Sequence, residues 1–174
     1  MKLLTAVVMF AAVASAQNTP ANPLSLVSKS IYGMAKKNIL GSVDKVPEEM
    51  WSYQPTKEVR TFAQLFAHIA DGQYEFCGVA AEGKSVQKDI EKTAKTKAEI
   101  VTALKDAFAY CEFRIRRAYR ANGGEQRNQS GKPRTRFGWL NWNLWHTWEH
   151  CENVVVYLRM NSLVPPSSER RQTK

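Results

Sequence analysis

Four stretches of the chain carry apolar residues at the three- and four-residue spacing of amphipathic α-helices. The first stretch begins at Asn22 and Pro23, because asparagine caps a helix well and proline suits its first turn. It ends between Gly41 and Pro47, and residues 47–51 predict a short extra turn. Its predicted core face consists of Leu24, Val27, Ile31, Met34, Ala35 and Asn38.

The second and third predicted helices have clear start signals. Thr61 caps the second helix and Gly83 ends it. Its predicted buried face consists of Phe62, Leu65, Phe66, Ile69, Gln73, Phe76, Cys77 and Ala80. Thr96 and Glu99 stand three residues apart as a capping box, which starts the third helix, and the glycines at 123–124 end it. Its predicted core face consists of Ile100, Leu104, Ala107, Phe108, Cys111, Ile115 and Ala118.

The last helix spans about residues 136–161 and follows a polar, basic loop at 122–136; two prolines at 165–166 then close the domain. Its predicted core face consists of Leu140, Leu144, Thr147, Cys151, Val154, Val155 and Leu158. No stretch alternates apolar and polar residues with a period of two, so no strands are expected. The pattern predicts an all-α, up-and-down four-helix bundle over residues 17–169, with a polar tail at 170–174.

The first sixteen residues have the three-part form of a secretory signal peptide. A basic start at Lys2 precedes an apolar run over residues 3–13, and the Ala-Ser-Ala sequence at 14–16 is typical of a signal peptidase site. The alternative, a buried amphipathic helix, is disfavoured because the run has no polar face. No later stretch reaches the ~18 apolar residues of a membrane span. We therefore expect cleavage after Ala16 and a secreted or periplasmic protein that begins at Gln17.

The amino-acid composition further narrows the class of protein. A hydrophobic content of 44% argues against a disordered chain, and three cysteines are too few for a disulfide scaffold. Cys77, Cys111 and Cys151 lie among apolar residues at helical positions, where a free cysteine packs as a small core residue. Core packing is therefore the expectation for all three, and a disulfide between two of them is the alternative in an oxidising compartment.

The chain is basic, with a formal net charge of +9, of which Lys2 carries one unit. Eight basic residues fall within 23 positions, opposed there by Glu125 alone. This basic cluster consists of Arg114, Arg116, Arg117, Arg120, Arg127, Lys132, Arg134 and Arg136. A solvated basic face is the simplest interpretation, and an anionic ligand or envelope surface is the alternative. No recognition motif supports nucleic-acid binding.

All three histidines fall on comparable flanks of two predicted helices, at the border of the apolar faces. His146 and His150 stand four residues apart, so they lie one turn apart and can bind one ion together. His68 lies on a similar flank of the second helix, beside Gly72. Three imidazoles with an open fourth position are typical of catalytic zinc, whereas structural zinc sites have four protein ligands. The alternative is three unrelated, partly buried histidines.

No catalytic residue is identified near the histidines. Three carboxylates lie on the same helices, but their helical angles turn them away from the histidine flank. They are Asp71, Glu75 and Glu149. A glutamate placed as in zincin metalloproteases is also missing between His146 and His150, so a metalloprotease is not indicated.

Four tryptophans follow one another at a spacing of three residues and therefore fan around the last helix. They are Trp139, Trp142, Trp145 and Trp148. Only Trp139 shares the histidine flank, together with Asn143 and Tyr157. We expect the other three to pack against the 122–136 loop, a neighbouring helix or a dimer partner.

Two segments of the chain resemble the DinB/YfiT-like superfamily. The first, WSYQPTKEVRTFAQLFAHIADGQ, has the elements Trp-x-x-x-Pro-Thr, Arg-Thr-Phe and Leu-x-x-His, and the second is the closing helix WNLWHTWEHCENVVVYLRMNSLVPPSS. The resemblance covers about residues 22–169. It implies an up-and-down four-helix bundle, often dimeric, that holds a divalent metal ion with three histidines. The matching positions here are His68, His146 and His150.

The resemblance also implies a chemistry. Family members of known activity use the metal to activate a thiol or a water, as bacillithiol-dependent S-transferases and mycothiol-dependent maleylpyruvate isomerase do. After His150 the family's frequent Arg-Gly-Gln is replaced by Cys-Glu-Asn. We expect a zinc or nickel ion and a hydrolase or thiol S-transferase that acts on an unidentified small molecule. The alternative is a non-catalytic bundle of the cell envelope that binds a metal or an anionic surface.

Overall fold

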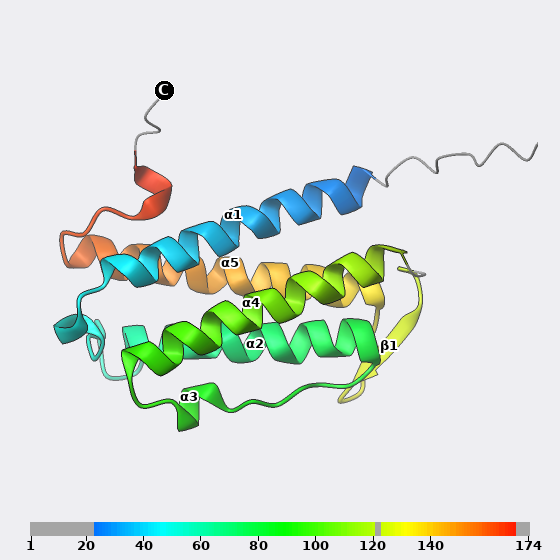
Figure 1. Cartoon of the computed structure of the whole chain (residues 1–174), viewed down its shortest axis with the longest axis horizontal. Coiled ribbons are helices and arrows are strands. Elements are labelled where there is room, and N and C mark those ends of the chain that lie inside the picture. The colour runs from blue at the N-terminus through cyan, green and yellow to red at the C-terminus, as the bar shows by residue number, and fades with distance from the viewer. Residues whose placement is uncertain (1–22, 121–122, 170–174) are drawn as a thin grey trace, which may run out of the picture.

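The computed structural model describes residues 23–120 and 123–169. The predicted signal peptide at 1–16 and the polar tail at 170–174 lie outside the described residues. Within the described ranges, no helix has an apolar stretch sufficient to cross a membrane. The elements in chain order (Figure 1) are α1 (Pro23–Lys45), η1 (Glu48–Met50), α2 (Phe62–Glu82), α3 (Ile90–Thr93), α4 (Lys97–Arg120), β1 (Gln126–Gln129), β2 (Lys132–Thr135), α5 (Arg136–Met160) and η2 (Pro166–Ser168).

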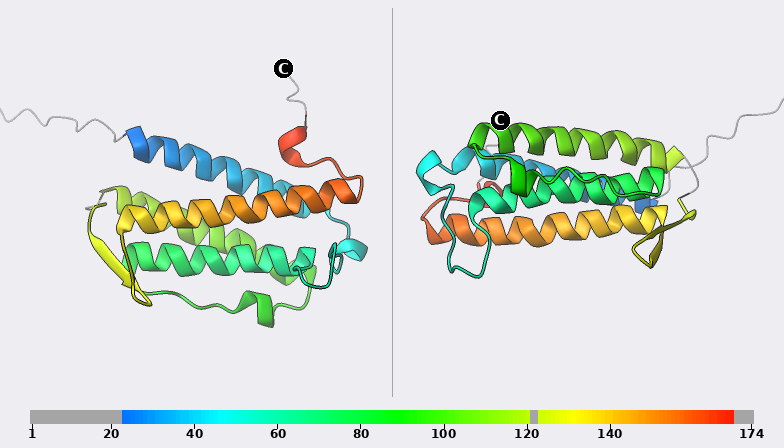
Figure 2. Two further views of the ribbon diagram at one scale, coloured as in Figure 1. Left: turned by 180° about the vertical axis from the view of Figure 1, so that it is seen from behind. Right: turned by 90° about the horizontal axis from the view of Figure 1, so that it is seen from below.

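The long helices α1, α2, α4 and α5 pack together, which confirms the predicted all-α four-helix bundle. Helix α2 packs against α4 and α5, and α1 packs chiefly against α5. Helices α2 and α4 run in the same direction, opposite to α1 and α5 (Figures 1 and 2). The helices therefore do not simply alternate up and down, because residues 83–96 return along α2 before α4 begins.

The start signals of α2 and α4 work as predicted. Thr61 Oγ1 accepts a hydrogen bond from the Gln64 backbone N–H, and the Gln64 side chain accepts one from the Thr61 N–H. Thr96 and Glu99 form the corresponding box at the start of α4. Gly83 ends α2 in the left-handed conformation, with a φ of 76° that glycine adopts without steric cost. These local signals therefore fix the register of both helices.

Helix α1 turns to the core a face that matches the predicted one only in part, since Ala35 is buried as expected but other positions differ. Tyr32, Ile39 and Val43 are buried, whereas Val27 and Met34 are 56% and 49% exposed. The predicted face did not include Tyr32, which is buried. Its hydroxyl lies inside the core and donates a hydrogen bond to a buried glutamine side chain.

Residues 126–135 form a β-hairpin where only a loop was expected. Ser130 and Gly131 connect the antiparallel strands with φ values of 50° and 74°, which suit a tight hairpin turn. The prediction of no strands is wrong here because both strands are polar, so they lack the apolar alternation of a half-buried strand. The hairpin packs over the start of α5, where the Trp139 indole N–H donates to the Arg127 carbonyl.

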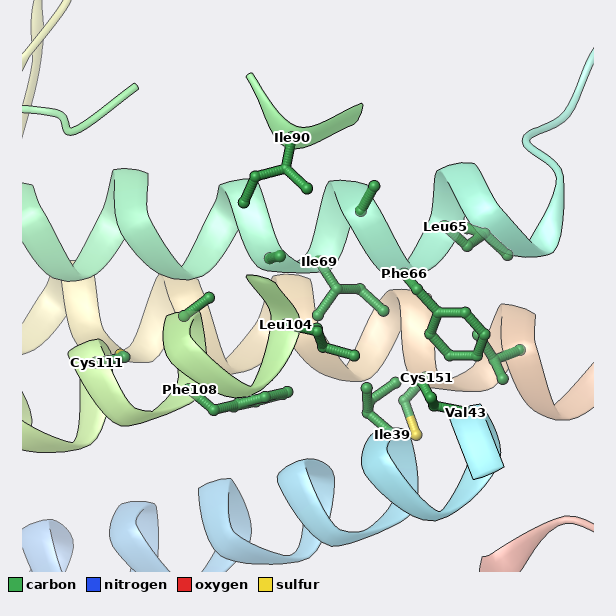
Figure 3. Packing of buried hydrophobic residues seen from close by; sticks show 14 of the residues in the cluster. Ile39, Val43, Leu65, Phe66, Ile69, Ile90, Leu104, Phe108, Cys111 and Cys151 are labelled. Carbon is green, nitrogen blue, oxygen red and sulfur yellow. The ribbon is translucent and has the colours of Figure 1, made fainter. Parts of the chain in front are cut away.

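The hydrophobic core lies between the four long helices. Figure 3 shows Ile39 from α1, Phe66 from α2, Leu104 from α4 and Cys151 from α5 around this interior. The core positions predicted on α2, α4 and α5 are buried or half-buried, except Ala118, whose side chain lies outside the described residues. Packing of these faces sets the spacing between α2 and α5, which carry the histidines.

A disulfide joins Cys77 of α2 to Cys111 of α4, with 5.3 Å between their Cα atoms. Cys151 is a buried free thiol. All three cysteines are buried in the core as expected, but Cys77 and Cys111 lie there as a disulfide, the alternative, and not as free thiols. The parallel packing of α2 and α4 brings these cysteines together, and that packing was not foreseen.

The disulfide is expected to contribute to stability through the unfolded chain. A cross-link across a sequence separation of 34 residues stabilises by ~3–4 kcal/mol in the chain-entropy model. Reduction should therefore lower the free energy of unfolding by about that amount, as measured by urea denaturation. A Cys77→Ala/Cys111→Ala variant should not respond to the reductant, whereas Cys151→Ala should respond like the wild type. Detection of three free thiols in the unreduced protein would contradict the pairing.

Candidate metal centre

The three histidines predicted as a set meet between α2 and α5. His68 projects from α2, and His146 and His150 project from the antiparallel α5. One nitrogen from each ring lies within 4.8 Å of the other two. The Nε2 atoms of His68 and His146 are 3.1 Å apart, and the ring centroids are separated by 4.5 to 5.0 Å. The fold therefore brings together residues 78 positions apart in sequence.

The donor set fits a transition-metal ion. Zinc binds histidine nitrogen at ~2.0–2.1 Å, so two ligands on a tetrahedral ion lie about 3.4 Å apart. The 3.1 Å between His68 Nε2 and His146 Nε2 is close to that spacing. His146 Nδ1 is buried without a hydrogen-bond partner among the described residues. The His146 ring is therefore aligned by packing and by the other two histidines.

Burial keeps the three histidines neutral. Desolvation, followed by the charges of His150 and His68, lowers the pKa of His146 to about 3. Desolvation, followed by the charges of His68 and Arg60, lowers the pKa of His150 to about 4. The pKa of His68 is also lowered, first by burial and then by Arg60. Neutral imidazoles present the lone pairs that a metal ion requires.

Gly72 allows α2 to approach the His146 ring closely. A Cβ atom at this position would lie 2.5 Å from His146 Cε1 and 2.8 Å from Nδ1, well inside van der Waals contact. Sequence reasoning placed Gly72 beside His68 without assigning it a role. Its role is steric, because any side chain here would displace the His146 ring.

The hydrogen-bonding partner of His68 is Glu91, which sequence reasoning missed. Glu91 Oε2 lies 3.1 Å from His68 Nδ1, and its Oε1 accepts a hydrogen bond of 2.9 Å from Arg60 Nε. A carboxylate on the outer nitrogen directs the other nitrogen inward and makes it more basic, as around many metal-bound histidines. Glu91 lies in the short helix α3, within a polar connection that has no distinctive pattern. Only the return of this connection along α2 brings it to the site.

Asp71 helps to position Glu91 and does not itself contact the histidines through a hydrogen bond among the described residues. Its carboxylate accepts hydrogen bonds of 2.9 and 3.0 Å from the backbone N–H groups of Ile90 and Glu91, at the start of α3. Among the described residues, neither Glu75 nor Glu149 hydrogen-bonds a histidine of the cluster, as their helical angles predicted. Glu149 is exposed, and burial followed by the Asp71 charge raises the pKa of Glu75.

A buried polar network fixes α5 against α2 behind the histidines. Gln73 Oε1 accepts hydrogen bonds from the Tyr32 hydroxyl at 2.8 Å and from Asn143 Nδ2 at 3.0 Å. Its Nε2 donates to Thr147 Oγ1 at 2.8 Å. Asn143 and Thr147 flank His146 on α5, and Gln73 follows Gly72 on α2. The network therefore sets the register in which the histidines meet.

A cavity of about 690 Å³ opens beside His150. Its walls include residues 54–60 of the loop before α2, together with Glu91 and Tyr157. The Gln54 side chain holds this loop by donating to two of its carbonyl groups, at 2.7 and 2.9 Å. The histidine cluster thus borders a space in which a small molecule can lie.

Of the four tryptophans on α5, Trp139 is placed as its helical angle predicted, whereas Trp145, expected to pack against another part of the protein or a dimer partner, is 56% exposed. Trp139 is buried and stacks on Phe76, whose ring in turn contacts His146 at 5.1 Å between centroids. The exposed Trp142 lies 4.3 Å from the Arg134 guanidinium of the hairpin. Trp139 therefore supports the site only indirectly, through Phe76.

Part of the basic cluster is neutralised within the chain. Glu125 pairs with both Arg127 and Arg136, and Glu82 pairs with Arg114 at 2.8 Å. Hydrogen bonds from Arg136 and Arg127 lower the pKa of Glu125. The cluster therefore offers an anionic partner fewer free charges than the count from sequence indicates.

Comparison with known proteins finds one matching family model and a similar solved structure. The sequence model of the DinB superfamily matches residues 33–154, a range that includes all three histidines. A solved structure of a DinB-like protein from Bacillus subtilis, YjoA, superposes with a TM-score of 0.63. The match covers 84% of this chain and 99% of that one, at 18% sequence identity. No curated protein matches the sequence.

Replacing Gly72 with alanine is expected to damage the metal centre without breaking the helix. Alanine normally stabilises a helix interior by up to ~1 kcal/mol, but here its Cβ would push the His146 ring away. We expect metal affinity to fall by about tenfold or more, the range seen when ligand orientation is lost. Gly33→Ala is the matched control, because nothing lies within 4 Å of its added Cβ. Equal metal affinity in both variants, measured by calorimetric titration, would contradict this role.

The depressed histidine pKa values predict an acid-sensitive metal-free protein. The unfolded chain takes up protons as the pH falls below ~6.5, whereas His146 stays neutral in the folded chain down to about pH 3 and His150 down to about pH 4. The free energy of unfolding should therefore fall as the pH is lowered from ~6.5 towards 4. Urea denaturation at several pH values measures this slope. A His146→Gln/His150→Gln variant should show a shallower slope, and an unchanged slope would contradict the assignment.

Proposed function

Because the chain belongs to the DinB superfamily and brings its only three histidines together, we propose that it binds one divalent metal ion through His68, His146 and His150 and acts on a small molecule. The observation that carries the proposal is the close approach of three neutral ring nitrogens beside a cavity. The ion is proposed to be zinc or nickel, because both accept three imidazole ligands.

The proposed reaction is a hydrolysis or a thiol transfer. When bound, an ion with three protein ligands and an open position lowers the pKa of a coordinated water or thiol and polarises a carbonyl. The chain's own residues orient the site. Glu91 keeps the His68 proton on Nδ1 and so directs Nε2 to the ion, and Phe76 shields one edge of the His146 ring from water. His150 borders the cavity through which a substrate enters.

Export of the protein is part of the proposal. The tripartite pattern of residues 1–16 supports it, and so does the Cys77–Cys111 disulfide, since disulfides persist mainly in oxidising compartments. A secreted or periplasmic enzyme would work on substrates outside the cytoplasm. The dimer frequent in the family stays a prediction.

Metal binding is tested with the mature chain expressed without a polyhistidine tag. We expect one ion per chain by elemental analysis, and an affinity loss of more than about a hundredfold in His150→Ala, because two nitrogens cannot replace three. Glu91→Gln should weaken binding by ~10–100-fold, since it alters the partner of His68. Glu149→Gln changes an exposed carboxylate on the same helix and should have no effect. A wild-type chain without metal, or full occupancy in His150→Ala, would rule out the centre.

The reaction class is tested by comparing the metal-loaded protein with its His150→Ala variant. Simple esters and amides report hydrolysis, and thiol–electrophile pairs report S-transfer. Turnover that depends on both the metal and His150 is the expected result for one of these substrate sets. Equal rates in the two proteins would refute a catalytic role for the centre.

A further inference from the structure

We infer that Arg60 binds a carboxylate group of the substrate in the cavity beside His150. This inference rests on the proposed metal centre and adds the class of substrate, a small organic acid. Arg60 and His150 line the same cavity, so one molecule can contact both. Glu91 connects the two parts of the site, because it contacts Arg60 through one oxygen and His68 through the other.

The guanidinium of Arg60 is only partly used by the chain. Its Nε donates to Glu91 at 2.9 Å, and among the described residues its two terminal nitrogens have no hydrogen-bond partner. The side chain is 40% exposed and borders the cavity. Two adjacent N–H donors on a planar guanidinium match the two oxygens of a carboxylate. The free edge of Arg60 is therefore suited to such a group.

The position of Arg60 is fixed from two sides. Glu91 holds its Nε, and its backbone carbonyl accepts a hydrogen bond of 3.0 Å from the Tyr157 hydroxyl. Tyr157 lies two turns after His150 on the same side of α5, so this bond ties Arg60 to the helix that carries two of the histidines. A pre-positioned guanidinium loses less side-chain freedom on binding than a mobile one.

A carboxylate fits this site better than a phosphate. Phosphate sites commonly use backbone N–H groups at a helix start. Here the first N–H groups of α2, those of Phe62 and Ala63, already donate to loop carbonyls at 3.0 Å. Glu91 and Glu58 also border the cavity and would repel a doubly charged group more than a singly charged one. Lys57 is the other cation at the cavity, and it is exposed on the loop.

The test uses the full mature chain loaded with cobalt, whose visible absorption reports binding at the metal. The probes are 3-mercaptopropionate and 3-mercaptopropionamide, which share a thiol and differ in charge. In Arg60→Gln we expect the affinity for the acid to fall by about tenfold or more, the effect of losing charge-assisted hydrogen bonds. The affinity for the amide should change by less than about twofold.

Matched variants separate the carboxylate contact from other effects. Glu149→Gln changes an exposed carboxylate on α5 and should keep the preference for the acid, as should Lys57→Gln at the edge of the cavity. Loss of the preference in Lys57→Gln, an equal change for both probes in Arg60→Gln, or no binding of either probe to the cobalt-loaded wild type would overturn the inference. A chain that binds no cobalt would instead refute the metal centre, and the inference with it.

Discussion

The candidate site depends on the close approach of α2 and α5 where Gly72 faces the His146 ring. Without a side chain at residue 72, the ring fits against the backbone of α2 and comes within 3.1 Å of His68. The hydrogen bonds of Gln73 to Asn143 and Thr147 fix the register of the two helices at the same level. Steric room and register together allow side chains from two helices to share one ion.

The unusual path of the chain supplies the rest of the site. After α2, residues 83–96 return along that helix, and α4 then runs parallel to it (Figure 1). This return places Glu91 beside His68, and the parallel packing places Cys77 beside Cys111. Asp71 fixes the returning segment by accepting hydrogen bonds at the start of α3. One connection therefore accounts for both the outer partner of the site and the covalent link between helices.

The sequence predicts what local rules determine. The caps at Thr61 and Thr96 gave the starts of α2 and α4, and Gly83 gave the end of α2. A turn of about 100° per residue placed the three histidines on comparable flanks of two helices. It misses what depends on distant contacts. The buried face of α1 includes Tyr32, whose hydroxyl donates to Gln73 of α2, and Glu91 reaches His68 only through the path of the connection. The hairpin was missed for another reason, since its polar strands lack an apolar alternation.

The charges around the site bear on what it can bind. Burial keeps the three histidines neutral. Glu91 contacts the cluster directly through His68, and the positive charge of Arg60 compensates the negative charge of Glu91. A divalent ion added to this set leaves a clear positive balance in a partly buried space, where charges interact more strongly than in water. An organic acid restores that balance when its carboxylate contacts Arg60 and its reactive group contacts the ion. The same balance would disfavour cationic molecules, so the arrangement proposed to hold the metal would also select among substrates.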